Sequence, residues 1–383
     1  MSRWSAWTTA TPCLVAAKRA FLSAQQCHED GQTKHPKHRR RTPRVEASLA
    51  NFILARSPKH IKHPETQPIA AMSASFTLNT GAKIPAVGLG TWQSDPGQVA
   101  TAVENALKSG YRHIDAAFVY GNENEVGDGI RKAIEGGVCK REDIFVTSKL
   151  WCTYHRTPEA CLDEGLKRLG LDYIDLYLMH WPVPMNPNGN HPMFPKHEDG
   201  SRDLDMKEWN HIKTWKEMEK LLKTGKTRAI GVSNYSVKFL EELLPHCEVM
   251  PAANQIENHP YCPQQDIVDL CKSKGILVEA YSPLGSTGSP LFQEEGVQEV
   301  AKKHNVGPGT ILISYQALTP GAVNKGQCAL PKSVTPSRIE ENLKTVKLDS
   351  SDMDALEGIH KKKGITRFVY PAFGVNLGFP DKQ

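Results

Sequence analysis

The sequence predicts a single α/β domain folded as a (β/α)8 TIM barrel, with a β-hairpin before it and a C-terminal loop after it. From Ser75 onward, short apolar runs alternate with amphipathic stretches, a pattern typical of parallel βα units. Eight such units fit a closed barrel better than an open doubly wound sheet. The glycine signature of a dinucleotide-binding sheet is also missing, because Gly88-Leu89-Gly90 has no third glycine.

The first expected element is the hairpin. Residues 76–85 alternate apolar and polar side chains around the turn Asn79-Thr80-Gly81, which favours two short antiparallel strands. The barrel strands that follow are short runs rich in apolar and β-branched residues. We predict them at residues 87–91, 113–117, 144–150, 174–181, 229–234, 253–259, 277–284 and 329–333.

The expected helices lie between these strands. In each window apolar residues recur at helical spacing, so that one face can pack on the barrel and the other can meet solvent. We predict helices at residues 99–108, 125–135, 159–169, 209–223, 237–244, 264–274, 293–304 and 336–346.

Residues 1–71 differ from the rest of the chain in net charge and in hydrophobic periodicity. They hold 12 Lys and Arg against 4 Asp and Glu, out of totals of 47 and 42, so residues 72–383 carry a net charge of −3. A mildly acidic body argues against nucleic acid as its partner. The segment has little hydrophobic periodicity, so we expect a disordered extension, or upstream sequence ahead of a start at Met72. A mitochondrial transit peptide or a nuclear-type basic cluster is the alternative.

Composition excludes several other classes of protein. The 9 cysteines form no Cys-x-x-Cys pair, so neither zinc-ligand spacing nor a disulfide framework is indicated. No apolar run reaches the roughly 18 residues of a membrane span, and no secretory signal is present. We therefore expect a cytoplasmic, monomeric protein with no membrane segment, or a mitochondrial one if residues 1–71 are a transit peptide.

Four complementary side chains are expected at one rim of the barrel. Active sites of such barrels lie at the C-terminal ends of the strands. Asp115 and Tyr120 follow the second predicted strand, Lys149 ends the third, and His180 ends the fourth. Each has an ordinary structural explanation as an ion pair, a rim aromatic or a buried histidine. The four types together at successive strand ends favour a catalytic site.

These residue types suit the reduction of a carbonyl group. When hydride reaches the carbonyl carbon, the oxygen needs a proton, and a tyrosine with its ordinary pKa of about 10 is a poor donor at neutral pH. We expect the Lys149 ammonium to lower the pKa of Tyr120 and Asp115 to keep that ammonium charged. His180 could donate a hydrogen bond to the substrate oxygen.

Specific motifs accompany these residues between positions 75 and 379. They are Gly88-Leu89-Gly90-Thr91-Trp92, Gly110-Tyr111-Arg112-His113-Ile114-Asp115-Ala116-Ala117, Tyr120-Gly121-Asn122-Glu123, Ser148-Lys149-Leu150-Trp151, Leu178-Met179-His180-Trp181-Pro182, Gly231-Val232-Ser233-Asn234, Ala280-Tyr281-Ser282-Pro283-Leu284-Gly285 and Leu330-Pro331-Lys332-Ser333. With them the sequence resembles the aldo-keto reductases, and among these the fungal-type NADP-dependent glycerol dehydrogenases and glyceraldehyde or aldehyde reductases.

The resemblance implies an oxidoreductase that interconverts small aldehydes or ketones and alcohols with NADPH or NADP+. Asp115, Tyr120, Lys149 and His180 match the catalytic tetrad, with Tyr120 as general acid. The resemblance places the pyrophosphate of the cofactor at residues 282–286, after the seventh strand. Loops after the seventh and eighth strands are a common phosphate site in barrels, where backbone N–H groups can bind anions. A 2′-phosphate calls for fixed cations. The cofactor positions matched are Thr91, Trp92, Ser233, Asn234, Gln255, Tyr281, Ser282, Leu284, Ser286, Lys332, Ser333, Arg338, Glu341 and Asn342.

Within that set the resemblance assigns parts of the cofactor. Tyr281 would stack on the nicotinamide, and Ser233, Asn234 and Gln255 would hold its carboxamide. Lys332, Ser333 and Arg338 would grip the 2′-phosphate, while Glu341 and Asn342 would lie at the adenine. The structural alternative is a charged surface helix in which Arg338 and Glu341 pair at i,i+3.

The substrate pocket implied by the resemblance is aromatic. Its expected wall consists of Trp92, Val119, Trp151, His180 and Trp181, closed by a loop at residues 367–379. Such a wall accepts many aldehydes, so the natural substrate and the direction of catalysis stay open.

One departure from the family pattern lies at residues 317–322, which lengthen the link before the last strand. The extra loop is harmless if it bulges from the N-terminal face, whereas a shift of the last strand would weaken NADPH binding. Two other functions stay open. The first is a regulatory or structural barrel that binds NADPH without turnover. The second is another barrel enzyme, which would need a metal cluster or paired carboxylates at the strand ends, and the sequence has no motif for either.

Overall fold

The computed structural model describes residues 69–70, 74–317 and 324–382. Each of the eight predicted barrel strands is present, in most cases trimmed at its C-terminal end. The seventh stops at Tyr281 because Ser282 takes a left-handed φ of 52°, and the fifth stops before Asn234, whose φ is 61°. The barrel strands are β4 (Leu89–Gly90), β5 (His113–Asp115), β6 (Phe145–Leu150), β7 (Leu176–Met179), β8 (Ile230–Ser233), β9 (Ala253–Glu257), β10 (Leu277–Tyr281) and β11 (Cys328–Leu330).

These strands form one parallel sheet that closes on itself. The order is β11-β10-β9-β8-β7-β6-β5-β4, so neighbours in the chain are neighbours in the sheet. Parallel bridges between Val87 and Ala329, and between Gly90 and Lys332, join the first strand to the last. The predicted barrel is therefore confirmed.

Eight predicted helical windows contain helices. The last of them is wrong beyond Glu341, because residues 344–345 enter a short strand instead. Asn210 begins one helix by accepting from the backbone N–H of Lys213 at 2.9 Å, a typical N-cap. The helices in these windows are α2 (Val99–Lys108), α3 (Glu123–Glu135), α4 (Pro158–Leu169), α5 (His211–Leu221), α6 (Val237–Leu243), α7 (Gln265–Ser273), α8 (Glu295–His304) and α10 (Pro336–Glu341).

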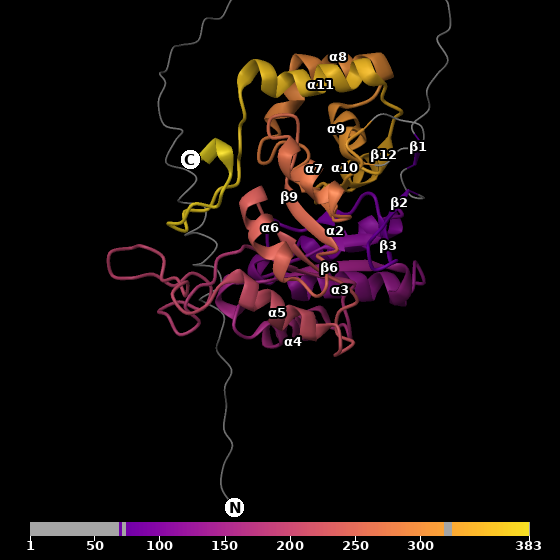
Figure 1. Ribbon diagram of the computed structural model, residues 1–383. Helices are drawn as coiled ribbons and strands as arrows, with labels where there is room; N and C mark the ends of the chain where they lie inside the picture. The colour runs from indigo at the N-terminus through magenta and orange to yellow at the C-terminus, as the bar shows by residue number, and fades with distance from the viewer. Residues whose placement is uncertain (1–68, 71–73, 318–323, 383) are drawn as a thin grey trace, which may run out of the picture. The chain divides into compact units, whose positions relative to one another are not determined.

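Two further helices are absent from the prediction. Helix α9 (Pro308–Gln316) is buried at every position from Thr310 to its end, so it has no polar face and its sequence shows no helical period. It contacts β11, whereas α8 packs against α9 and α11 (Ser350–Lys363). Figure 1 shows α8 and α11 side by side. Helix α9 therefore lies next to the barrel, and α8, which the periodicity did predict, lies outside it.

The N-terminal hairpin is confirmed as β2 (Ser75–Thr77) and β3 (Lys83–Pro85), paired antiparallel. Its Leu78 and Ile84 pack on Phe145 and Leu176, which are the first residues of β6 and β7. The hairpin thus covers the N-terminal end of the barrel, away from the strand ends expected to hold the site.

A short strand precedes the hairpin. Strand β1 (Ile69–Ala70) pairs antiparallel with β12 (Lys344–Thr345). Within residues 1–71 the structure describes only these two residues, so the expectation of disorder for the extension falls on positions outside the described part of the chain.

The last barrel strand keeps both neighbours despite the extra sequence before it. In β11, Cys328 lies opposite Glu279 and Leu330 lies opposite Tyr281, and the bridges to the first strand are also formed. Residues 318–322 of the extra sequence lie outside the described residues. On its C-terminal side, Lys325 N–H donates to the carbonyl of Tyr315 at 2.9 Å. Strand β11 is therefore in register with β10.

In the part of the chain that the structure describes, no helix is both long and apolar enough to span a bilayer.

Candidate active site

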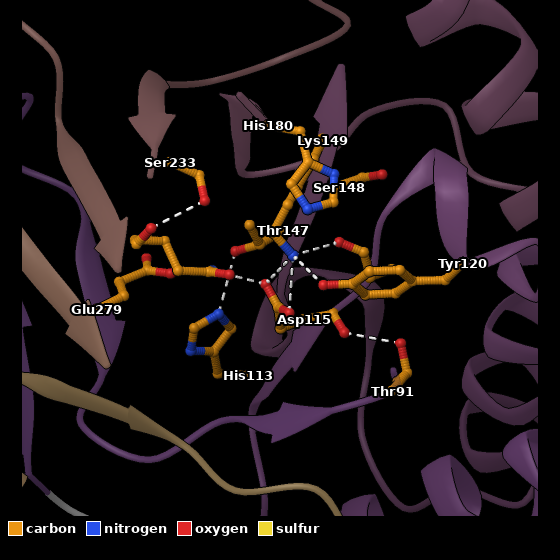
Figure 2. Close-up of polar contacts among 12 residues, drawn as sticks. Thr91, His113, Asp115, Tyr120, Thr147, Ser148, Lys149, His180, Ser233 and Glu279 are labelled. Carbon is orange, nitrogen blue, oxygen red and sulfur yellow. Dashed lines mark hydrogen bonds and ion pairs between the residues drawn. The ribbon is translucent and has the colours of Figure 1, made fainter. Parts of the chain in front are cut away.

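The four residues predicted for catalysis meet at the C-terminal ends of three neighbouring strands. Asp115 ends β5, Lys149 lies near the end of β6, and His180 directly follows β7. Tyr120 ends a single turn of 3-10 helix, η2 (Phe118–Tyr120), between β5 and α3. Figure 2 shows the Lys149 ammonium pointing between Asp115 and Tyr120.

Lys149 holds this group together. Its side chain is fully buried, and Nζ donates to Asp115 Oδ1 and Oδ2 at 2.8 Å each. It also donates to the carbonyl of Ala116 at 2.9 Å and to the Tyr120 hydroxyl oxygen at 3.2 Å. A buried ammonium is tolerated only when it is paired and fully hydrogen-bonded. Lys149 meets that condition, with Tyr120 as one of its partners.

The electrostatics of Lys149 and Tyr120 differ in one respect from expectation. Burial acts to lower the pKa of Lys149, but Asp115 and Tyr120 raise that pKa by more, so the ammonium stays charged. For Tyr120, burial raises the pKa, and this exceeds the lowering by Lys149. Lys149 thus acts on the pKa of Tyr120 in the expected direction, but burial outweighs it and the net shift is upward. The phenol is therefore protonated at neutral pH and beside a fixed cation.

His180 lies across the group from Asp115. Its ring meets the Tyr120 ring edge-on, with 5.8 Å between centroids, and its carbonyl accepts from Asn234 Nδ2 at 2.9 Å. Burial, and then the charge of Lys149, place its pKa well below the ordinary value. The imidazole is therefore neutral, and its Nδ1 is buried without a hydrogen-bond partner.

The predicted aromatic wall surrounds these groups. The Trp92 ring lies 4.8 Å from the Tyr120 ring, and the Trp151 ring lies 5.4 Å from that of His180. Val119 is next to Tyr120 in η2 and is partly buried against the core. Trp181 is the more distant member, and its ring packs at 5.5 Å on Phe373.

Two segments complete the wall. The first consists of residues 367–379, and its Phe373 contacts Trp181. The carboxylate of Glu257, at the end of β9, holds this segment by accepting from the backbone N–H groups of Phe368 and Val369 at 2.7 and 2.8 Å. The other segment links β7 to α5 and was missed by the sequence reasoning. Trp151 Nε1 donates to its Met193 carbonyl at 2.7 Å. That link has no periodic pattern, so nothing in the sequence pointed to it.

The residues predicted to hold a nicotinamide carboxamide are brought together. Ser233 Oγ donates to the Gln255 carbonyl at 2.8 Å, and Asn234 Nδ2 donates to Ser233 Oγ at 3.0 Å. The Tyr281 hydroxyl donates to Asn234 Oδ1 at 2.8 Å. Gln255 differs, because its Nε2 donates to Asp115 Oδ1 at 2.8 Å and to Glu279 Oε2 at 2.7 Å. Gln255 thereby links Asp115 to the carboxyl of Glu279, which the sequence analysis did not single out.

Thr91 directly follows β4 and supports the end of the neighbouring strand β5. It is buried, its hydroxyl donates to the carbonyl of Asp115 at 2.8 Å, and its own carbonyl accepts from Asn122 Nδ2 at 2.9 Å. Thr91 therefore fixes the backbone at the end of β5, and Asn122 is a further supporting residue that sequence reasoning missed.

The segment after β10 has the backbone of a binding loop. Ser282 and Ser286 take left-handed φ angles of 52° and 64°, which cost energy for residues with a side chain and cluster at functional sites. Gly285 N–H closes the turn on the Ser282 carbonyl at 2.9 Å. Leu284, between them, is partly buried against the core. Gln93, after β4, has a φ of 56° at the same rim.

The residues predicted for a 2′-phosphate follow β11. Lys332 Nζ donates to the Gln93 carbonyl at 3.1 Å, and Arg338 Nη2 donates to Thr335 Oγ1 at 2.6 Å. Ser333 Oγ accepts from Thr335 N–H at 3.1 Å. Partial burial, together with the charge of Arg338, lowers the pKa of Lys332 although Asp95 opposes this. Two cations and a hydroxyl group therefore lie close together in an arrangement that an anion would stabilise.

Glu341 and Asn342, the residues expected at the adenine, lie at the C-terminal end of α10 instead of inside a longer helix. Asn342 is buried and its N–H donates to the Arg338 carbonyl at 3.0 Å, whereas Glu341 is exposed. The described contact of the Arg338 guanidinium is with Thr335, not the i,i+3 pair with Glu341 that a purely structural helix would favour.

The protein is thus a closed parallel barrel with a buried Lys–Asp pair beside a tyrosine and a histidine at its strand ends. The Aldo/keto reductase family matches residues 86–361. D-galacturonate reductase of Hypocrea jecorina is 55% identical over 316 residues, covering 82% of this chain and 100% of that protein. Glycerol 2-dehydrogenase (NADP(+)) of Saccharomyces cerevisiae is 52% identical over 302 residues, covering 77% and 94%.

A solved structure agrees with these sequence relationships. The aldose reductase from Schistosoma japonicum superposes with a TM-score of 0.70 at 40% identity, over 77% of this chain and 93% of that one. The chain belongs to the aldo/keto reductase family and is an oxidoreductase of that family.

Proposed function

We propose that the protein reduces small aldehydes and ketones with NADPH, or oxidises the corresponding alcohols with NADP+, and that Tyr120 is the general acid. The observation that carries this proposal is the position of the Tyr120 hydroxyl, 3.2 Å from an ammonium that Asp115 holds in a buried pair. A phenol there can release its proton to a substrate oxygen, because the fixed charge stabilises the phenolate that remains.

The residues present fit an NADPH molecule. The left-handed loop at Ser282 and Ser286, and the neighbouring cations Lys332 and Arg338, suit its phosphates. Ser233, Asn234 and Tyr281 would hold the nicotinamide end, and Gln255, with both amide hydrogens engaged, would contribute its carbonyl oxygen. When bound, the cofactor supplies the hydride.

The protein's own groups then handle the proton and the substrate. Tyr120, kept protonated by burial, donates to the carbonyl oxygen, and Lys149 stabilises the resulting phenolate. Asp115 keeps Lys149 charged and fixed. His180, being neutral, orients the substrate oxygen without competing as an acid. Trp92 and Trp151 exclude water from the reacting carbonyl.

We further propose that the substrates are small polyhydroxy aldehydes or ketones. The relatives are named for galacturonate, glycerol and aldose, all of which carry several hydroxyl groups. The aromatic wall would accept their carbon skeletons, while His180 and Tyr120 hold the carbonyl oxygen.

The experiment is NADPH consumption by the full chain with glyceraldehyde, galacturonate and dihydroxyacetone, followed by loss of reduced-nicotinamide absorbance. Turnover with any of them is the expected result. Tight NADPH binding without turnover on any aldehyde or ketone would overturn the proposal and indicate a regulatory barrel instead.

A further inference from the structure

We propose that Glu279 is a positioning residue of this site, which stores a proton below the tetrad and transmits its charge state to Asp115 and Lys149 through Gln255. The inference rests on the proposed function, since it gives Glu279 a part in the same reaction. Glu279 is a lone acid in the otherwise apolar strand β10, between Val278 and Ala280.

The first observation is an unbroken set of hydrogen bonds from Glu279 to the general acid. Gln255 Nε2 donates to Glu279 Oε2 at 2.7 Å and to Asp115 Oδ1 at 2.8 Å. Asp115 accepts from Lys149, which donates in turn to the Tyr120 hydroxyl. In Figure 2, Asp115 and Lys149 lie between Tyr120 and Glu279. A change in the charge of Glu279 therefore reaches Tyr120 through bonded, buried groups.

The second observation is the shortage of positive charge around Glu279. The residue is fully buried, and its Oε1 has no hydrogen-bond partner. Among the described residues, Lys149 is the cation that acts on Glu279, and its hydrogen bonds go to Asp115, Ala116 and Tyr120. One ammonium would thus face two carboxylates if Glu279 were ionised. A second buried negative charge without its own cation is costly, so the carboxyl keeps its proton.

The groups that face Glu279 from the surrounding strands agree. Cys328 of β11 lies opposite it, and burial keeps the pKa of that thiol well above its ordinary value. His113 of β5 lies beyond Cys328, and burial, followed by Lys149, lowers its pKa to about 3. Both are neutral at physiological pH. Burial, and then Asp115, raise the pKa of Glu279 itself to about 7.

This places a proton-dependent step within the working range of pH. Below the pKa of Glu279 the carboxyl is neutral, and the charge of Lys149 is available to the Tyr120 phenolate. Above it, the new negative charge competes for Lys149 and disfavours the phenolate, so proton donation by Tyr120 slows. We expect kcat for reduction to fall by about threefold or more as pH rises through this step.

The decisive variant is Glu279→Gln. Its side-chain oxygen can still accept from Gln255, but the group no longer titrates. Expected results are NADPH binding like that of the wild type by fluorescence titration, and loss of the fall in kcat near neutral pH. Glu279→Leu cannot accept a hydrogen bond from Gln255, so its kcat should be lower than that of the wild type at every pH. Glu279→Gln, which keeps that hydrogen bond, should not show this general loss.

An infrared titration of the full chain provides a readout that does not depend on activity. A protonated buried carboxyl gives a C=O stretching band, which for Glu279 should disappear across neutral pH and be missing from Glu279→Gln. Glu123 is the matched control: it is buried, burial raises its pKa, and it accepts from Ser148 Oγ instead of Gln255. Glu123→Gln should retain both the Glu279 band and the pH step in kcat.

The outcomes separate the inference from the proposed function. A wild-type enzyme that turns over while Glu279 is ionised throughout, or a Glu279→Gln enzyme that keeps the pH step, overturns the inference alone. A wild-type protein without turnover on any carbonyl compound overturns the proposed function, whatever the infrared band shows.

Discussion

Lys149 donates to both carboxylate oxygens of Asp115 at 2.8 Å, and the same ammonium also donates to the Ala116 carbonyl at 2.9 Å and to the Tyr120 hydroxyl at 3.2 Å. The pair satisfies its own charges, so Tyr120 is the group whose protonation can change during a reaction while the pair stays intact. A fixed, solvent-free cation of this kind needs no reorganisation when charge develops on the phenol.

Replacing Tyr120 with Phe should lower kcat by roughly a hundredfold or more, because one positioned acid typically contributes that much. The Phe ring can keep the contact with Trp92, so the wall and NADPH binding should change little. Turnover with glyceraldehyde and fluorescence titration of NADPH measure the two effects. Near-normal turnover in Tyr120→Phe would remove Tyr120 as the acid.

Replacing Arg338 with Ala should weaken NADPH binding by roughly tenfold to a hundredfold, since a hydrogen bond to a charged group contributes about 1.5–3 kcal/mol. NADH lacks the 2′-phosphate, so its affinity should change little. Lys347→Ala, which removes an exposed cation elsewhere on the surface, is the control for general charge effects. Equal losses for NADPH and NADH would contradict the assignment of Arg338.

Replacing Phe373 with Ala should raise KM for aldehydes and leave the affinity for NADPH nearly unchanged. Phe373 is buried and its ring packs on Trp181 at 5.5 Å, so the change removes the contact between the C-terminal segment and the wall. Steady-state kinetics at saturating NADPH measure it. An unchanged KM, with normal folding by circular dichroism, would show that residues 367–379 do not border the bound substrate.

We propose that residues 72–383 contain the whole catalytic unit. A chain beginning at Met72 should keep its kcat, but it loses the pairing of Ile69 and Ala70 with β12. Because a backbone hydrogen bond contributes about 1 kcal/mol net, its Tm should fall by a few degrees at most. A chain beginning at Thr66 keeps the pairing and is the matched control. Loss of turnover in the Met72 chain, with normal folding, would disprove the proposal.

The strands and the tetrad could be predicted because both depend on local signals. Barrel strands are apolar runs of limited length, and the residue types at their C-terminal ends meet at one rim whatever the packing details. Strand ends were overestimated where Asn234 and Ser282 take left-handed backbone conformations. Those conformations depend on the loop they serve, and Asn and Ser occur in many extended segments.

Features that depend on tertiary burial could not be predicted in the same way. Helix α9 has no polar face, so periodicity could not identify it. The net direction of the Tyr120 pKa depends on burial outweighing Lys149, which spacing along the chain does not reveal. Glu279 did leave a signal, an acid inside an apolar strand, but its partner Gln255 lies on β9, and only the register of β9 with β10 joins them.

Glu279 should also make the stability of the fold depend on pH. Its pKa is about 7 in the folded protein against an ordinary value of 4.5, so the folded state binds this proton more tightly than the unfolded state. The folded state therefore loses stability as pH rises from the unfolded value through the folded one, by about 3 kcal/mol in total. Because glutamine does not titrate, the stability of Glu279→Gln should not include this pH-dependent loss.

Denaturant unfolding of wild type and Glu279→Gln at about pH 5 and about pH 8 measures this difference. The free energy of unfolding of Glu279→Gln, relative to that of the wild type, should rise by a few kcal/mol from the lower to the higher pH. The other titrating groups are common to both proteins, so their effects cancel in this comparison. Glu123→Gln again serves as the control for a buried carboxyl outside the Gln255 link. A difference between Glu279→Gln and wild type that stays constant with pH would mean that Glu279 is ionised in both the folded and the unfolded state, and it would overturn the proposal that Glu279 holds a proton in this site.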